Sequence, residues 1–152
     1  MRERRPLVLR TYRGLASMAT PVLPLWWAYR LRRGKEHGAR FSERRGEATV
    51  PRPDAPLVWV HAASVGEMLA VVPILEHVCA GGFAALVTSG TVTSARLAEW
   101  RLPPRAIHQF APYDSPRYVA RFLDHWRPDL ALFAESDLWP NLITGAADRG
   151  IP

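Results

Sequence analysis

The sequence contains few of the residues that build covalent cross-links and metal centres. Among 152 residues there is one cysteine, Cys79, so an internal disulfide is excluded. Cys79 lies among apolar residues of an expected helix, which favours a buried structural thiol over a reactive one. The five histidines are scattered and form no cluster with metal-ligand spacing, so we expect no metal site. The G-x-G-x-x-G fingerprint of dinucleotide-binding folds is also missing.

The N-terminal part lacks an uncharged run long enough to cross a membrane. Residues 14–29 carry no charge, but these 16 residues fall short of the roughly 20 that a spanning helix needs, and they include two prolines. The run ends with Trp26, Trp27 and Tyr29 and has arginines on both sides, a pattern typical of a segment that lies in the membrane interface. The alternative is a helix that packs on its own domain or on a partner domain.

Positive charge is concentrated in the first third of the chain. The whole sequence has a formal net charge of +6 at pH 7. Residues 1–56 hold 13 Lys/Arg and 5 Asp/Glu, a net charge of +8, whereas residues 57–152 hold 7 and 9, a net charge of −2. A segment this basic suits anionic partners such as lipid headgroups or phosphorylated substrates. Nucleic acid is the weakest alternative, because the arginines flank a Trp-rich apolar run and the following domain is slightly acidic.

From residue 57 onward, short apolar runs alternate with helical segments. We expect strands at about 57–61, 83–88, 106–110 and 129–134. We expect helices at about 65–80, 92–101, 116–126 and 138–149. Repeated strand–helix units favour a parallel sheet, so the sequence predicts an α/β, Rossmann-like fold with helices on both faces. The remaining parts are a membrane-proximal apolar and basic segment, residues 1–33, and a basic loop and linker, residues 34–56.

Residues that can do chemistry follow the first expected strand. The stretch from Ser64 to Glu67 fits a capping box, in which a serine starts a helix and a glutamate stands three residues later. In one interpretation the Glu67 carboxylate accepts from the Ser64 backbone N–H and only caps the helix. In the other, Glu67 is a general base, because ligands of open α/β sheets bind outside the carboxyl ends of the strands. The spacing alone does not decide between them.

Further polar residues follow the later strands. Thr91 is the expected N-cap of the helix after the second strand, and Asp114 or Ser115 that of the helix after the third. Glu135 follows the fourth strand. Two carboxylates and a hydroxyl-rich turn at one edge of a sheet suit the recognition of sugar hydroxyls or phosphate.

Five sequence blocks give the chain a family resemblance. They are residues 33–36 (RGKE), 59–67 (WVHAASVGE), 89–94 (SGTVTS), 112–116 (PYDSP) and the pair 122–129 (FLDHWRPD) with 135–141 (ESDLWPN). Together they resemble the N-terminal domain of the 3-deoxy-D-manno-octulosonic acid (Kdo) transferases of lipopolysaccharide synthesis, from about residue 30 to the end. One departure is Asp137, which stands where the family usually has a glutamate.

The resemblance implies a GT-B glycosyltransferase, in which two Rossmann-like domains face each other across a cleft. This chain would be the acceptor-side half, and a C-terminal domain would bind most of the donor, CMP-Kdo. The acceptor would be lipid A or its precursor at the cytoplasmic face of the inner membrane. Transfer would invert the anomeric centre and would need no cofactor and no metal in the active site.

The resemblance also implies roles for individual residues. Glu67 would be the catalytic base, and Glu135 would assist it. The residues that would line the cleft are Ser64, Gly66, Gly90, Thr91 and Ser94. From their charge, we expect Arg33 and Lys35 to meet acceptor phosphates.

The length of the chain leaves more than one possibility open. The sequence stops where the first domain would be completing its sheet, so we expect the donor-binding domain to be absent from it. The chain is then a fragment, a truncated reading frame or one half of a split enzyme, and we expect no turnover from it alone, because a base without bound donor transfers nothing. The alternative is a catalytically inactive remnant that binds the membrane surface.

Overall fold

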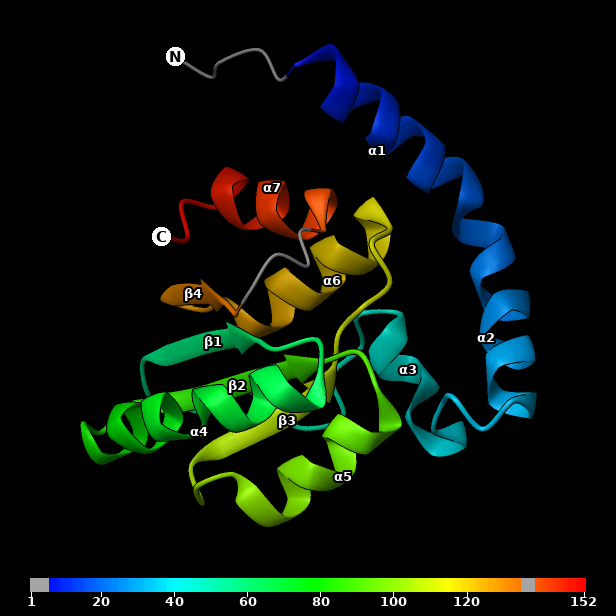
Figure 1. The fold of residues 1–152 in the computed structure, drawn as a ribbon. Coiled ribbons are helices and arrows are strands. Elements are labelled where there is room, and N and C mark those ends of the chain that lie inside the picture. Colours follow the sequence, from blue (N-terminus) through cyan, green and yellow to red (C-terminus); the bar gives the residue numbers. More distant parts are fainter. Residues whose placement is uncertain (1–5, 135–138) are drawn as a thin grey trace.

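The computed structural model describes residues 6–134 and 139–152, and a parallel sheet forms the centre of the domain (Figure 1). The strands lie in the order β3-β2-β1-β4, and all neighbouring pairs are parallel. Their bounds are β1 Leu57–His61, β2 Ala84–Ser89, β3 Ala106–Phe110 and β4 Leu130–Phe133. The chain winds from β1 outwards to β3 and then returns to add β4 on the other side of β1. Such a reversal creates a crevice at the carboxyl ends of the strands, where α/β proteins bind ligands.

Helices cover both faces of the sheet, and the predicted fold class is confirmed. Their bounds are α4 Val65–Ala80, α5 Val92–Arg101, α6 Pro116–Trp126 and α7 Pro140–Asp148. Helices α4 and α5 lie on one face, and α6 and α7 lie on the other (Figure 1). The predicted limits of β1, β3, α4, α5 and α6 coincide with those observed, whereas β2, β4 and α7 differ by one or two residues.

Alternate residues of β1 supply two separate cores. Trp59 is fully buried and faces α6 and α7, where it packs edge-on against Phe122 with ring centroids 5.1 Å apart. Val58 and Val60 face the opposite way and pack against α4 and α5. Every residue of β1 and β2 is buried, which is why both strands read as continuous apolar runs in the sequence.

The N-terminal arm, residues 7–32, runs as a nearly continuous helix along one side of the domain (Figure 1). It comprises α1 Leu7–Ala19, the 3-10 turn Thr20–Val22 and α2 Leu23–Arg32. The arm contacts α6 and α7 through α1, yet none of its residues is buried. Its exposed large apolar side chains are Leu7, Val8, Leu15, Met18, Val22, Leu25, Trp26 and Tyr29. Among the described residues, no helix has both the length and the apolar character that crossing a membrane requires.

Residues 34–56 are fastened to the domain through a few buried charged side chains, although many of their other residues are exposed. They contain the 3-10 turn Gly38–Arg40 and the short helix α3 Phe41–Arg44, which packs on β3. Three charged side chains of this segment, Glu36, Glu43 and Arg44, are at most 6% exposed. Burying a charged group is costly unless it forms ion pairs or hydrogen bonds. The groups that bond to these three side chains therefore show how the segment is attached to the domain.

Candidate functional site

A cavity of about 520 Å³ lies between the N-terminal arm and the carboxyl ends of the strands. The arm contributes apolar side chains and one cation to its wall, among them Ala16, Leu23, Trp26 and Arg30. The opposite wall is formed by residues that follow β1, β2 and β3, among them Ala63, Gly90, Thr91 and Tyr113. The cavity therefore joins an apolar wall to the edge of the sheet at which α/β proteins bind their ligands.

Glu67 belongs to a capping box at the start of α4 and bonds to Ala63, which lines this cavity. Its Oε2 accepts from the Ala63 N–H at 2.7 Å and its Oε1 from the Ser64 hydroxyl at 2.8 Å, while the Ser64 Oγ accepts from the Glu67 N–H at 3.3 Å. The backbone partner is thus Ala63, and the expected Ser64 N–H is wrong. A carboxylate has about four acceptor positions and two are used. A substrate hydroxyl can therefore still donate to Glu67, so the cap geometry is compatible with a base.

The start of α5 lies next to the start of α4. The Gly90 N–H donates to the Ala63 carbonyl at 3.3 Å. Thr91 is the N-cap, as predicted, because its Oγ1 accepts from the Ser94 N–H at 3.0 Å. The Ser94 hydroxyl lies 2.7 Å from Thr91 Oγ1, and Ser94 is fully buried. Ser94 therefore holds the Thr91 side chain in place from the interior of the domain.

The predicted site residues divide into groups by position. Gly90 and Thr91 line the cavity, whereas Ser64 and Gly66 are exposed at the start of α4. The expected phosphate contacts, Arg33 and Lys35, are exposed, and the Arg33 guanidinium lies 5.3 Å from the centre of the Tyr29 ring. Glu135 and Asp137 lie outside the described residues. The catalytic and substrate-binding roles of all these residues stay predictions.

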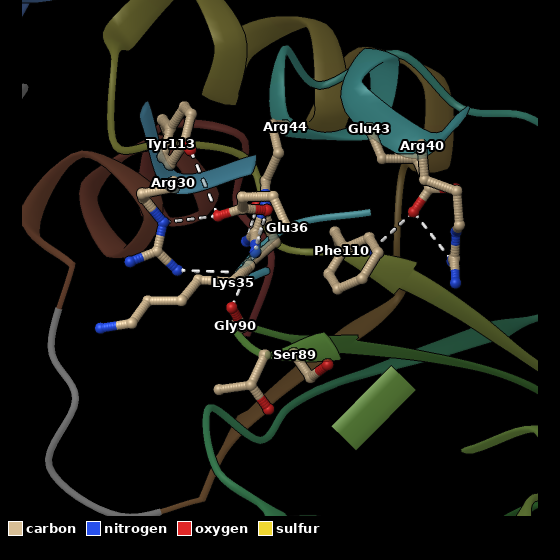
Figure 2. A network of polar contacts seen from close by, with 12 residues as sticks. Arg30, Lys35, Glu36, Arg40, Glu43, Arg44, Ser89, Gly90, Phe110 and Tyr113 are labelled. Carbon is tan, nitrogen blue, oxygen red and sulfur yellow. Dashed lines mark hydrogen bonds and ion pairs between the residues drawn. The ribbon is translucent and has the colours of Figure 1, made fainter. Parts of the chain in front are cut away.

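The cations that line the cavity belong to a buried network shown in Figure 2. Glu36 lies between two arginines: its Oε1 accepts from Arg30 Nε at 2.7 Å and its Oε2 from Arg44 Nε at 2.9 Å. The Tyr113 hydroxyl donates to the same carboxylate at 3.4 Å. Burial, and next the Glu36 charge, raise the pKa of Tyr113 to about 12, so the phenol stays protonated and donates. The network joins α2, the segment of residues 34–56 and the loop after β3.

A second network fixes α3 to β3 and contains a serine–histidine pair. The Glu43 carboxylate accepts from Arg40 at 2.8 and 2.9 Å and from the Phe110 N–H at 2.7 Å. Arg40 donates to His108 Nδ1 at 3.0 Å, and His108 Nε2 lies 2.8 Å from the Ser89 Oγ. Because a guanidinium only donates, Nδ1 accepts and Nε2 carries the proton. His108 therefore donates to Ser89 and cannot activate it as a nucleophile.

Asp114 has a different role from the one expected. The sequence suggested Asp114 or Ser115 as the cap of α6, but Ser115 occupies the N-cap position without a capping hydrogen bond, and its hydroxyl lies 2.7 Å from that of Thr20. Asp114 instead accepts from the Asn141 and Leu142 N–H groups at 3.0 and 2.9 Å and so caps α7. Because it also accepts from the Tyr12 hydroxyl at 2.9 Å, Asp114 links the N-terminal arm to the domain.

Sequence reasoning missed Glu36, Glu43, Arg44 and Arg30 as parts of the site. Local polarity marks residues 34–56 as a loop. Nothing local shows that the Glu43 carboxylate accepts from a backbone N–H of β3, or that Arg44 donates to backbone carbonyls that follow β2 and β3. One usable signal is that Glu36 belongs to the RGKE block, one of the five blocks that carry the family resemblance.

Comparisons with known proteins agree on one family. The family model of the 3-deoxy-D-manno-octulosonic-acid transferases matches residues 39–152. A mitochondrial protein of Arabidopsis thaliana, described as a probable 3-deoxy-D-manno-octulosonic acid transferase, is 39% identical over 95% of this chain and 33% of its own length. The transferases of Rickettsia bellii and Bordetella pertussis are 35% and 36% identical over 93% and 92% of the chain and 34% and 36% of theirs.

No solved structure matches the chain. The chain spans about a third of the length of these three curated relatives. The family match begins within the turn before α3 and extends beyond α7. The chain therefore belongs to the Kdo transferase family of glycosyltransferases.

Proposed function

We propose that this chain supplies the acceptor-side half of an enzyme that transfers Kdo from CMP-Kdo to a lipid A precursor with inversion. The observation that carries the proposal is the Glu67 carboxylate, which accepts from the N–H of Ala63, a residue that lines the cavity of about 520 Å³. Family membership supplies the reaction class. The remaining two thirds that the relatives possess would contribute the donor-binding domain of a GT-B fold.

The proposed step is a single displacement in which Glu67 acts as general base. An acceptor hydroxyl donates to a free lone pair of Glu67 and attacks the anomeric carbon of Kdo. The new carbon–oxygen bond forms as the bond from that carbon to the CMP phosphate breaks, the proton passes to Glu67 and CMP leaves with the electron pair. Attack opposite the leaving group inverts the centre. A positioned base of this kind contributes about 10²–10⁴-fold to the rate.

The N-terminal arm fits a substrate that resides in a membrane. Its exposed apolar side chains, including Trp26 and Tyr29, lie next to the exposed arginines Arg32 and Arg33. Aromatic residues at headgroup depth and arginines facing anionic lipid are typical of interfacial helices. We place the protein at the cytoplasmic face of the inner membrane, with the apolar wall of the cavity open to a lipid acceptor.

A second candidate function is binding to a membrane surface without catalysis. The exposed apolar arm favours it, because the arm needs no donor-binding domain to bind lipid. The two candidates differ in whether Glu67 changes a reaction rate.

The test replaces the matched third of the Bordetella pertussis relative with this chain and measures Kdo transfer from CMP-Kdo to a lipid A precursor. Glu67→Gln should lower the rate by about 10²–10⁴-fold, because an amide cannot take the proton. The control is Glu76→Gln, an exposed carboxylate on the same helix, which should leave the rate unchanged. Equal rates in the two variants would reduce Glu67 to a helix cap. Vesicle binding without transfer by the unsubstituted chimera would favour the second candidate.

A further inference from the structure

Arg44 is a buried arginine whose side chain spans the ends of two strands. It is 4% exposed. Its Nη2 donates to the Gly90 carbonyl after β2 at 2.7 Å, and its Nη1 donates to the Ala111 carbonyl after β3 at 3.1 Å. Its Nε donates to Glu36 at 2.9 Å, so the guanidinium holds three acceptors at once, and Figure 2 shows Arg44 with Glu36 and Gly90.

A continuous chain of hydrogen bonds leads from Arg44 to the proposed base. Arg44 holds the carbonyl of Gly90, and the N–H of the same residue donates to the Ala63 carbonyl at 3.3 Å. The N–H of Ala63 in turn donates to Glu67 Oε2 at 2.7 Å. Gly90 and Ala63 each use both backbone groups in this chain. Displacing Gly90 therefore displaces Ala63, and with it the hydrogen bond that orients the carboxylate.

We propose that Arg44 is a positioning residue for Glu67, acting through Gly90 and Ala63; this inference rests on the proposed function. Arg44 lines the cavity, but in this scheme it acts on the reaction through its hydrogen bonds to the protein and not through a substrate contact. It fixes the turn after β2, and the turn fixes the position of the carboxylate.

The site demands an arginine and not merely a positive charge. The planar guanidinium presents donors in a fixed fork, whereas a lysine ammonium is a compact charge that cannot span three acceptors of this spread. The guanidinium also lies 4.6 Å from the centre of the Phe110 ring and 5.6 Å from that of Tyr113, which restricts its plane. In Arg44→Lys the charge remains, but at least one of the two backbone carbonyls loses its donor.

The same network gives the N-terminal arm a connection to the base. Arg30 at the end of α2 shares the Glu36 carboxylate with Arg44. The Arg44 carbonyl accepts from the Tyr113 N–H at 2.9 Å, which ties α3 to the loop after β3. The positions of the arm and of Glu67 are therefore set by one buried group of side chains.

The experiment compares Arg44→Lys with Arg52→Lys in the chimera used above. Arg52 is a matched control, because it also joins the segment of residues 34–56 to backbone carbonyls, donating to Trp126 O at 2.7 Å and to Pro53 O at 2.8 Å, but at the amino end of the sheet. We expect Arg44→Lys to lower kcat by about 10²-fold with little change in KM, since a misplacement of about 1 Å costs that much. Arg52→Lys should leave both unchanged. A loss confined to KM, or equal kcat values in the two variants, would overturn the inference.

Hydrogen–deuterium exchange of the peptide containing Ala63 supplies a readout that does not depend on turnover. Its amide should exchange faster in Arg44→Lys and at the unsubstituted rate in Arg52→Lys; unchanged exchange in Arg44→Lys overturns the inference. If Arg44→Lys does not fold, Glu36→Gln replaces it, because the amide keeps the shape of the carboxylate but removes its charge and turns one acceptor oxygen into an NH2 donor, which weakens the hold on Arg44. Absence of transfer by the unsubstituted chimera would refute the proposed function, while the exchange measurement would still decide the role of Arg44.

Discussion

Gly46 is the point at which the segment carrying Arg44 meets α6, and its replacement by alanine should be strongly destabilising. Its φ of 77° lies in the left-handed region. An added Cβ would overlap the Tyr118 carbonyl oxygen and lie 2.9 Å from the carbonyl carbon of the same residue and 3.1 Å from Phe122 N. These are backbone atoms of a packed helix, so no flexible side chain can move aside.

The size of the effect follows from two separate contributions. The left-handed conformation costs a residue with a Cβ about 1–2 kcal/mol. Forcing an extra carbon into a packed contact costs about 1–3 kcal/mol more. We therefore expect Gly46→Ala to lower the free energy of unfolding by about 2–5 kcal/mol, a large part of the 5–15 kcal/mol that stabilises a typical domain.

Urea unfolding of Gly46→Ala and Gly34→Ala measures this directly. Gly34 has a similar φ of 68°, but an added Cβ there meets nothing within 4 Å. Gly34→Ala should therefore show only the conformational cost, about 1–2 kcal/mol. The difference between the two variants isolates the close approach of residue 46 to α6. Equal losses of unfolding free energy in the two variants would refute the idea that the contact between residue 46 and α6 holds the segment that carries α3 in place.

Two further predictions concern His108 and Asp114. Burial, with smaller contributions from Arg40 and Arg44, lowers the pKa of His108 to about 3. Because the unfolded chain binds the proton near pH 6.5 and the folded one does not, His108 makes stability fall by up to about 1.4 kcal/mol per pH unit from about pH 6.5 towards 3. The urea midpoints at pH 7 and pH 5 should therefore differ less in His108→Gln than in the unsubstituted chain. The same difference in both proteins would contradict this prediction. Asp114→Ala removes the cap of α7 and should cost about 2 kcal/mol, against about 0.5 kcal/mol for Asp124→Ala, which breaks an exposed ion pair; equal losses would rule out the capping role.

The sequence was sufficient to predict the ends of α4, α5 and α6, because short signals such as glycines, an N-cap residue and a proline set these ends. Helix α4 ends just before Gly81 and Gly82, and α5 starts after the Thr91 cap, as their residue types predict. Helix α6 ends before Arg127, which adopts a left-handed φ of 40° and is followed by proline. These signals act over a few residues, so a single sequence contains them whole.

The sequence was insufficient where a side chain bonds to a partner far along the chain. Asp114 stands at a good position to cap α6, but tertiary structure brings the N-terminus of α7 within its reach. Arg44 lies in a run of charged residues that is typical of an exposed surface, yet its acceptors follow β2 and β3. Such pairings depend on how the strands are ordered, and the local pattern does not encode them.

The two interpretations of Glu67 describe one geometry. The capping box predicted from the spacing is present, although its backbone donor is Ala63. The same hydrogen bond ties the carboxylate to Ala63, which lines the cavity, so the capping role explains how a base would be held near it. The choice between a cap alone and a cap that is also a base belongs to kinetics.

The most direct test of the account is whether this chain can replace the corresponding third of a relative that transfers Kdo. Mass spectrometry of a lipid A precursor incubated with CMP-Kdo and the chimera would detect the product, with the intact Bordetella pertussis relative as the positive control. The account predicts an acceptor that carries Kdo, formed by the chimera and lost in its Glu67→Gln variant. A folded chimera that binds acceptor vesicles and leaves the acceptor unmodified would contradict it.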